Sequence, residues 1–143
     1  MKKNKNSSNI IVYKILLLGD SESNKTRIFN KIINNKFDKL VYSSTLGVDF
    51  ETKIFEYKNK EYSINLYNIS GNERFQSITR ACYHMGEGYF IVFNLSNENS
   101  LYSIKKYIES LKEVIHDPKI VILGNETQNI NNIPDNTINH IKF

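Results

Sequence analysis

Apolar residues along the chain fall into runs and helical stripes that alternate from the N-terminus onward. Residues 10–18 (IIVYKILLL) form an apolar run ending at Gly19, which is typical of a strand buried on both faces of a sheet. From Lys25 to Asn35 the apolar residues recur at spacings of one, three and four, which predicts a helix. Runs at 88–95 (GYFIVFNL) and 119–123 (KIVIL) predict two further buried strands.

Two more strands and a second long helix complete the pattern. Residues 48–57 and 62–69 read as strands joined by the hairpin turn KNKE, and residues 101–115 carry a second helical stripe. Strands alternating with helices predict an α/β fold with a mainly parallel sheet. We expect a disordered tail at 1–9, one incomplete domain at 10–128, and a polar, Asn-rich remnant at 129–143.

Composition narrows the class of protein. The chain has 143 residues, 40% of them apolar, a net charge of +4 and one cysteine. A disulfide framework is excluded, and we expect a cytoplasmic protein, with peripheral attachment to membranes left open. No apolar run reaches the roughly 20 residues that span a bilayer, so no transmembrane segment is predicted. The charge is too weak to indicate a nucleic-acid partner.

The turn between the first strand and the first helix has the form of a phosphate-binding loop. Residues 19–26 read GDSESNKT, against the pattern G-x-x-x-x-G-K-[ST]. Lys25 would reach terminal phosphates and the Thr26 hydroxyl would ligate Mg²⁺. Asn24 replaces the second glycine but tolerates left-handed φ, and Glu22 is repelled by phosphate unless it points to solvent. The alternative is an ordinary strand–helix turn. The candidate nucleotide-binding residues are Gly19, Asp20, Ser21, Glu22, Ser23, Asn24, Lys25 and Thr26.

Several further segments resemble those of one family, in its order and spacing. They are KILLLGDS, STLGVDF, GNERFQSIT, ACYHMGEGYFIVFNLSNENSL and LGN. From about Val12 to Gln128 the chain resembles a small GTPase of the Ras superfamily, closest to its Rab branch. The resemblance implies a six-stranded, mostly parallel sheet, binding of GTP or GDP with Mg²⁺, slow hydrolysis, and a switch in membrane traffic.

The resemblance also implies roles for single residues. Thr26 matches the first Mg²⁺ ligand, and Thr45 matches the switch I threonine that closes on Mg²⁺ and the γ-phosphate. Gly71 matches the switch II glycine whose N–H senses that phosphate, and Asn125 begins the guanine motif. Partners of a Rab, its effectors or regulators, would bind through three aromatic residues, with packed core aromatics as the alternative: Phe50, Tyr67 and Tyr83.

Departures from the family pattern weaken the expected chemistry. Asn68 stands where an aspartate supports Mg²⁺, and a neutral amide does not supply that charge. Asn72 stands where a glutamine positions the attacking water, one methylene too short, so hydrolysis is expected to be slow or absent. Gln128 replaces the aspartate that accepts two bonds from guanine, and each lost bond to a charged group costs about 1.5–3 kcal/mol.

The expected family features end early. The second guanine loop, the last strand and the C-terminal helix are missing from the predicted pattern, and the chain ends without the cysteines that carry a prenyl anchor. Three hypotheses therefore stay open. The chain is a GTP-binding switch, a non-catalytic Rab-like binding module, or a truncated gene product. The departures favour a degenerate family member whose nucleotide binding and hydrolysis are weak or lost.

Overall fold

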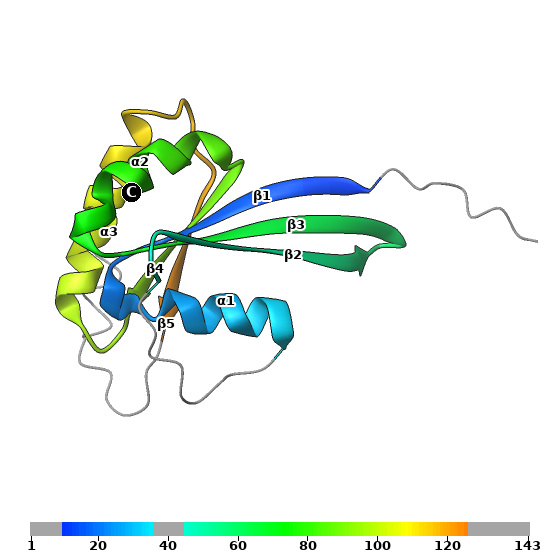
Figure 1. The fold of residues 1–143 in the computed structure, drawn as a ribbon, viewed down its shortest axis with the longest axis horizontal. Coiled ribbons are helices and arrows are strands. Elements are labelled where there is room, and N and C mark those ends of the chain that lie inside the picture. Colours follow the sequence, from blue (N-terminus) through cyan, green and yellow to red (C-terminus); the bar gives the residue numbers. More distant parts are fainter. Residues whose placement is uncertain (1–9, 36–44, 126–143) are drawn as a thin grey trace, which may run out of the picture.

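A computed structural model describes residues 10–35 and 45–125, which form a five-stranded sheet with helices on both faces (Figure 1). The strand order is β2-β3-β1-β4-β5. β1 runs parallel to β3 and β4, β5 runs parallel to β4, and β2 is antiparallel to β3. The predicted α/β class and mostly parallel sheet are confirmed. The strands are β1 (Ile11–Leu18), β2 (Val48–Tyr57), β3 (Lys60–Ile69), β4 (Gly88–Asn94) and β5 (Ile120–Asn125).

The β2–β3 hairpin closes through a two-residue turn. Lys58 and Asn59 both have positive φ, 49° and 59°, and Tyr57 pairs directly with Lys60. A turn with two left-handed residues matches the right-handed twist of the strands it joins. The predicted hairpin is therefore confirmed, with β3 beginning at Lys60, two residues earlier than the apolar pattern indicated.

One helix covers each half of the core. On one face, Phe29 of α1 (Lys25–Asn34) packs with Leu17 and Leu66. On the other face, α3 (Glu98–Lys112) buries its apolar stripe against β1 and β4. This layered arrangement places the carboxyl ends of β1, β3 and β4 beside the N-termini of α1 and α3 (Figure 1), the edge at which α/β sheets bind ligands. The stripe consists of Leu101, Ile104, Ile108 and Leu111.

Helix boundaries differ from the pattern where polar residues set them. α3 begins at Glu98 rather than at residue 101, because Asn97 Oδ1 accepts a hydrogen bond from Asn99 N at 3.0 Å and caps the helix. A third helix, α2 (Gln76–Cys82), was not predicted. Its seven residues carry too few apolar positions for a helical stripe, and the short 3₁₀ helices η2 (Glu73–Phe75) and η3 (Tyr83–Met85) flank it.

The prediction that the first strand is buried on both faces is wrong for its first half. Ile11, Val12 and Tyr13 are 41–47% exposed, whereas Leu16 and Leu17 are fully buried. Figure 1 shows β1, β2 and β3 extending as an overhang past the described helices, so neither layer reaches this part of the sheet. Three aromatic rings stack along the overhang, with centroids 6.3 and 5.5 Å apart: Tyr13, Tyr62 and Phe55.

Some expectations concern parts of the chain that the structure does not describe. The predicted tail at 1–9, the polar remnant at 129–143, and Gln128 lie outside the described residues. Within residues 10–35 and 45–125, no helix is both long enough and apolar enough to cross a bilayer.

Candidate functional site

The loop between β1 and α1 has the backbone path that a phosphate site requires. Gly19 has φ of 138°, and a Cβ there would strike the Val92 carbonyl oxygen, so only glycine fits. After the short 3₁₀ helix η1 (Ser21–Ser23), Asn24 adopts the left-handed conformation, with φ 60° and ψ 33°. α1 begins directly afterwards, so its N-terminal N–H groups face the loop. Asparagine thus replaces glycine at little cost in geometry.

The Lys25 side chain lies buried across this loop. Its Nζ donates to the carbonyl oxygens of Gly19 and Asp20, both at 2.7 Å, and lies 3.4 Å from Ser23 Oγ. Burial lowers the pKa of Lys25 to about 8, and the Asp20 carboxylate acts in the opposite direction. The ammonium group is therefore held at the point where the loop would meet an anion.

Glu22 turns away from the loop interior. Its Oε2 accepts a hydrogen bond from Asn97 Nδ2 at 2.9 Å, and its carbonyl oxygen accepts one from Asn94 Nδ2 at 3.3 Å. The repulsion expected between this carboxylate and a phosphate is thereby reduced. Asn125, at the end of β5, also contacts the loop, because its Nδ2 donates to Ser23 O at 3.2 Å.

A second cluster lies beside the loop, where α1, β2 and β3 meet. Asn68 Nδ2 lies 3.0 Å from Thr26 Oγ1, 3.2 Å from Thr45 Oγ1 and 3.4 Å from Asp49 Oδ2. The two threonine hydroxyls are 3.2 Å apart, and Thr45 Oγ1 donates to Asp49 Oδ2 at 3.3 Å. Asn68 is completely buried, and its Oδ1 has no hydrogen-bond partner among the described residues. The structure thus brings together Thr26, Thr45 and Asn68, as predicted, and adds Asp49, which was not.

Gly71 and Asn72 follow β3 and cover the loop from the other side. A Cβ on Gly71 would clash with the backbone of Gly19, Asp20 and Ser21, so this segment lies directly against the loop. Asn72 Oδ1 accepts a hydrogen bond from Arg74 N at 3.0 Å and caps η2. The side chain expected to position a water is therefore bonded to its own backbone.

Comparison with known proteins decides the family. The model of the Ras family matches residues 14–138. The chain is 33% identical to the Ras-related protein Rab-8B of Homo sapiens over 116 residues, which cover 80% of this chain and 56% of the relative. It is 32% identical to Rab-10 of Caenorhabditis elegans over 117 residues, 81% of this chain and 58% of the relative. The chain belongs to the Ras family. It is a Rab-like member, as its motifs predicted, and it spans a little over half the length of these relatives.

Ras-family GTPases use GTP or GDP together with Mg²⁺, and the two parts of this Rab-like site fit those ligands differently. The loop path, the buried Lys25 and the start of α1 fit the phosphates. The second cluster offers Mg²⁺ the oxygens of Thr26, Thr45 and Asp49, but as oriented it does not fit the ion, because an amide N–H group lies among these oxygens. Asn68 presents two amide hydrogens to Thr26 and Thr45, and its oxygen points elsewhere. Within the described residues, no three His, Cys, Asp or Glu side chains form an alternative metal site.

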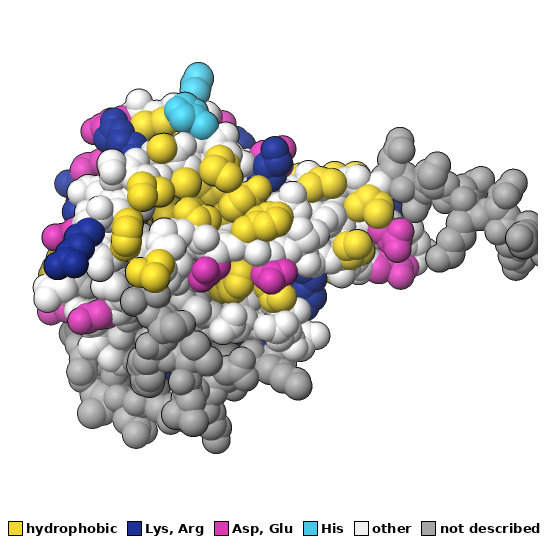
Figure 2. Space-filling view, viewed as in Figure 1, with side chains coloured by type: hydrophobic (Ala, Val, Ile, Leu, Met, Phe, Trp, Pro, Cys, Tyr) yellow, Lys and Arg dark blue, Asp and Glu magenta, His cyan; other side chains and the backbone are white. Residues whose placement is uncertain are grey.

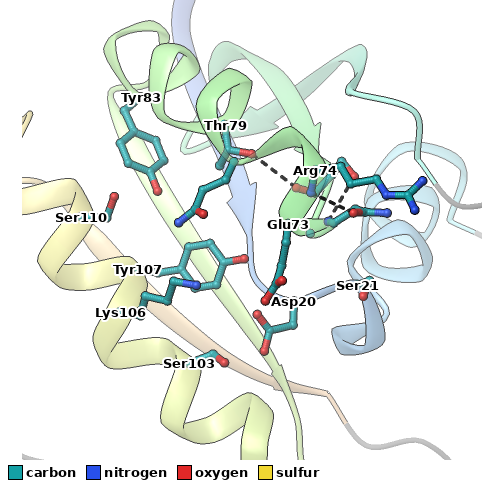
Figure 3. Close-up of a pocket in the computed structure, with 14 residues that line it drawn as sticks. Asp20, Ser21, Glu73, Arg74, Thr79, Tyr83, Ser103, Lys106, Tyr107 and Ser110 are labelled. Atoms are coloured by element: carbon teal, nitrogen blue, oxygen red, sulfur yellow. Dashed lines mark hydrogen bonds between the residues drawn. The ribbon is translucent and has the colours of Figure 1, made fainter.

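A polar cavity of about 470 Å³ adjoins the loop on the side of α3 (Figure 3). The carboxylates of Asp20 and Glu73 enter it from the loop and from η2, and Tyr107 faces them from α3. Burial raises the pKa of Tyr107, and the nearby Asp20 carboxylate raises it further. The sequence did not indicate Tyr107 as part of the site, because it lies on a helix predicted from its apolar stripe alone.

The three aromatic residues expected on a partner face divide into two groups. Phe50 is half exposed, and its ring packs against Tyr67 with centroids 4.9 Å apart. Figure 2 shows hydrophobic side chains gathered on the face that carries α2 and the β2–β3 hairpin. Ile78 of α2 is an exposed apolar residue as well. The expectation for Tyr83 is wrong. Its side chain is 2% exposed, because it packs into the core cluster beneath α3 and lines the cavity.

Proposed function

We propose that this Rab-like chain is a binding module that retains weak nucleotide binding and hydrolyses GTP slowly or not at all. The observation that carries the proposal is the hydrogen bond from Arg74 N to Asn72 Oδ1 at 3.0 Å. An amide oxygen that caps its own helix is not free to orient a water for attack on phosphate. Asn72 is also one methylene shorter than glutamine, and small displacements of a positioning group cost large factors in rate.

Weak binding follows from the groups that face the nucleotide. Lys25 and the loop backbone supply contacts to phosphate, and these favour residual affinity. The Asn68 amide donates to the two threonine hydroxyls that would ligate Mg²⁺, so a bound triphosphate would lack its usual counter-ion. Gln128 replaces the carboxylate that selects guanine, which supports low selectivity for guanine over adenine.

The partner surface of the proposed module is the exposed apolar face that carries α2 and the β2–β3 hairpin (Figure 2). Phe50 and Tyr67 form a packed pair, and Ile78 of α2, which follows the switch II segment in the sequence, is exposed. Exposed apolar side chains grouped on one face are typical of protein interfaces. We propose that effectors or regulators of Rab proteins bind here, and that the protein acts in the cytoplasm or peripherally at membranes.

Nucleotide content of the purified protein tests the proposal. Heat release followed by chromatography is expected to yield far less than one nucleotide per folded chain. Thermal unfolding in the presence of Mg²⁺ with GTP or ATP measures how tightly each nucleotide binds. A ligand at its Kd stabilises by only about 0.4 kcal/mol, whereas a thousandfold excess over Kd gives about 4 kcal/mol. One tightly bound GDP or GTP per chain would contradict the proposal.

A GTP-binding switch is the second candidate function, and the preserved loop favours it. Asn24 keeps the left-handed turn, and Glu22 is directed to Asn97 rather than to the phosphate position. The same experiment separates the two functions. Guanine nucleotide at full occupancy, displaced by GTP but not by ATP, would support the switch. A folded and empty protein supports the binding module.

A further inference from the structure

We infer that Asn68 holds the switch I residue Thr45 against Thr26 through protein contacts alone, without Mg²⁺ and without nucleotide. In this arrangement the Asn68 amide joins the hydroxyls of Thr26 and Thr45, the two groups that a metal ion would otherwise connect. The inference concerns regulation of the proposed site. Its consequence for partner binding rests on the proposed function, whereas the hydrogen bonds themselves do not.

The hydroxyl of Thr45 is fully used by protein partners. A hydroxyl has one hydrogen and two lone pairs. Thr45 Oγ1 donates its hydrogen to Asp49 Oδ2 at 3.3 Å, so the 3.2 Å contact with Thr26 Oγ1 is one in which Thr26 donates. The Asn68 amide takes the second lone pair at 3.2 Å. No lone pair of Thr45 remains for a metal ion or for a phosphate-bound water.

The Asn68 amide is suited to this role because it carries hydrogens where a carboxylate carries none. Its two N–H groups are shared among three oxygens, those of Thr26, Thr45 and Asp49. An aspartate at this position would accept hydrogen bonds from the two threonine hydroxyls, but its carboxylate would lie against that of Asp49, a repulsion that a cation between the two carboxylates would relieve. The exchange of a carboxylate for an amide therefore replaces a requirement for a cation with hydrogen bonds.

The position of the cluster connects it to the partner surface. Thr45 comes three residues before β2, and Asp49 belongs to β2 and directly precedes Phe50. Gly47 is fixed as well, because its carbonyl oxygen accepts a hydrogen bond from Ser70 N at 2.8 Å. With both ends of this short segment held, the start of β2 keeps one arrangement whatever occupies the phosphate loop.

Hydrogen exchange of nucleotide-free protein tests the inference. Peptides covering residues 45–50 are compared in EDTA and in millimolar MgCl₂, for the wild type and for Asn68→Asp. The wild type is expected to exchange within about twofold of the same rate in both buffers. Asn68→Asp is expected to exchange about tenfold faster in EDTA and to slow when Mg²⁺ is added. Slowing of the wild type by about tenfold on adding Mg²⁺ would overturn the inference.

A pair of threonine variants keeps the test decisive if Asn68→Asp fails to fold. Thr45→Val removes the hydroxyl of the cluster, whereas Thr52→Val removes a hydroxyl that donates to Asn65 Oδ1 at 2.9 Å, on the same two strands. In EDTA, only Thr45→Val is expected to speed exchange at 45–50, by about tenfold. Equal rates in the two variants would contradict the inference. Nucleotide content is measured separately, so a tightly bound GTP would end the proposed function without deciding this result.

Discussion

The phosphate loop at 19–26 and the strip at 68–72 lie against each other, yet substitutions in them have different consequences. In the loop, Asn24 departs from the family pattern but keeps the left-handed turn, and the Glu22 carboxylate points to Asn97. In the strip, Asn68 and Asn72 are hydrogen-bonded to protein groups. In the family, these two positions support the metal ion and orient the attacking water.

The difference separates two ways of binding a ligand. The loop acts mainly through backbone N–H groups and a helix N-terminus, so it tolerates any side chain that permits the same path. In the proposed function the strip acts through the charge and reach of single side chains, so a change from carboxylate to amide would remove the chemistry although the shape is kept. We therefore expect recognition through the backbone to persist where recognition through side-chain charge is lost.

The largest expected effect on stability lies at the contact between the loop and the strip. Gly71→Ala would drive a Cβ into the backbone of the loop, and we expect a loss of about 3 kcal/mol in the free energy of unfolding. Gly47→Ala is the control, because its Cβ meets open space but its φ of 85° is strained, and it should cost about 1–2 kcal/mol. Urea unfolding measures both. Equal losses would show that Gly71 does not pack against the loop.

The buried lysine tests whether the loop is held as described. Because the pKa of Lys25 is lowered to about 8 by burial, the folded protein releases this proton before the unfolded chain does. The unfolded state then binds more protons, so stability rises with pH above about 8. Relative to Lys25→Met, the wild type should gain about 2 kcal/mol between about pH 7.5 and about pH 9.5.

This difference is read from urea unfolding of both proteins across that range. Half-buried tyrosines such as Tyr107, whose pKa is raised, lower stability at higher pH, but they are present in both proteins and their effects cancel. A difference that does not change with pH would mean that the Lys25 ammonium is not buried in solution.

Smaller losses of stability are expected at the N-cap residues Asn72 and Asn97. Asn72→Ala should cost about 0.5 kcal/mol, because it caps a single 3₁₀ turn, and should leave GTP turnover unchanged. Asn97→Ala should cost about 1 kcal/mol, since Asn97 caps the long helix α3 and also contacts Glu22. Chemical denaturation and single-turnover hydrolysis provide the measurements. A fall in turnover by about tenfold in Asn72→Ala would show that its amide does position water.

The smallest effect is expected at two asparagines with left-handed φ. Asn24→Gly and Asn35→Gly should each change the free energy of unfolding by about 0.5 kcal/mol or less, because both residue types accept this conformation. Only Asn24→Gly is expected to tighten binding of GTP, since Asn24 borders the phosphate position and Asn35 ends α1 far from it. Titration of both variants with nucleotide measures this, and equal affinities would mean that Asn24 does not limit the approach of the phosphates.

The pattern of apolar residues predicted the elements that bury a stripe or a run. β1, α1, the β2–β3 hairpin, β4, α3 and β5 all lie where it indicated, because hydrophobic burial fixes them. The apolar pattern did not predict α2, whose helical conformation depends on tertiary packing rather than on its own short sequence. Nor did it predict that Ile11 and Tyr13 are exposed, since a run of apolar residues does not reveal how far the neighbouring helices extend.

Motif spacing predicted which residues meet at the site but not what they do there. Thr26, Thr45 and Asn68 are brought together, and Lys25 lies buried across the adjoining loop. The direction of the Asn68 amide, the part played by Asp49, and the burial of Tyr83 depend on side-chain orientation in three dimensions, for which a linear sequence carries no signal.

The overhang of β1, β2 and β3 beyond the helices gives the sheet a gradient of local stability. At its outer end, strand pairing is supported chiefly by stacked aromatic rings, whereas near Asn68 both faces are covered. Fraying should therefore begin at the Lys58–Asn59 turn and become less frequent toward Asn68. The outer end of the hairpin would open transiently while its inner end stays paired. Limited proteolysis should cleave the chain at this turn and leave the cluster around Asn68 intact.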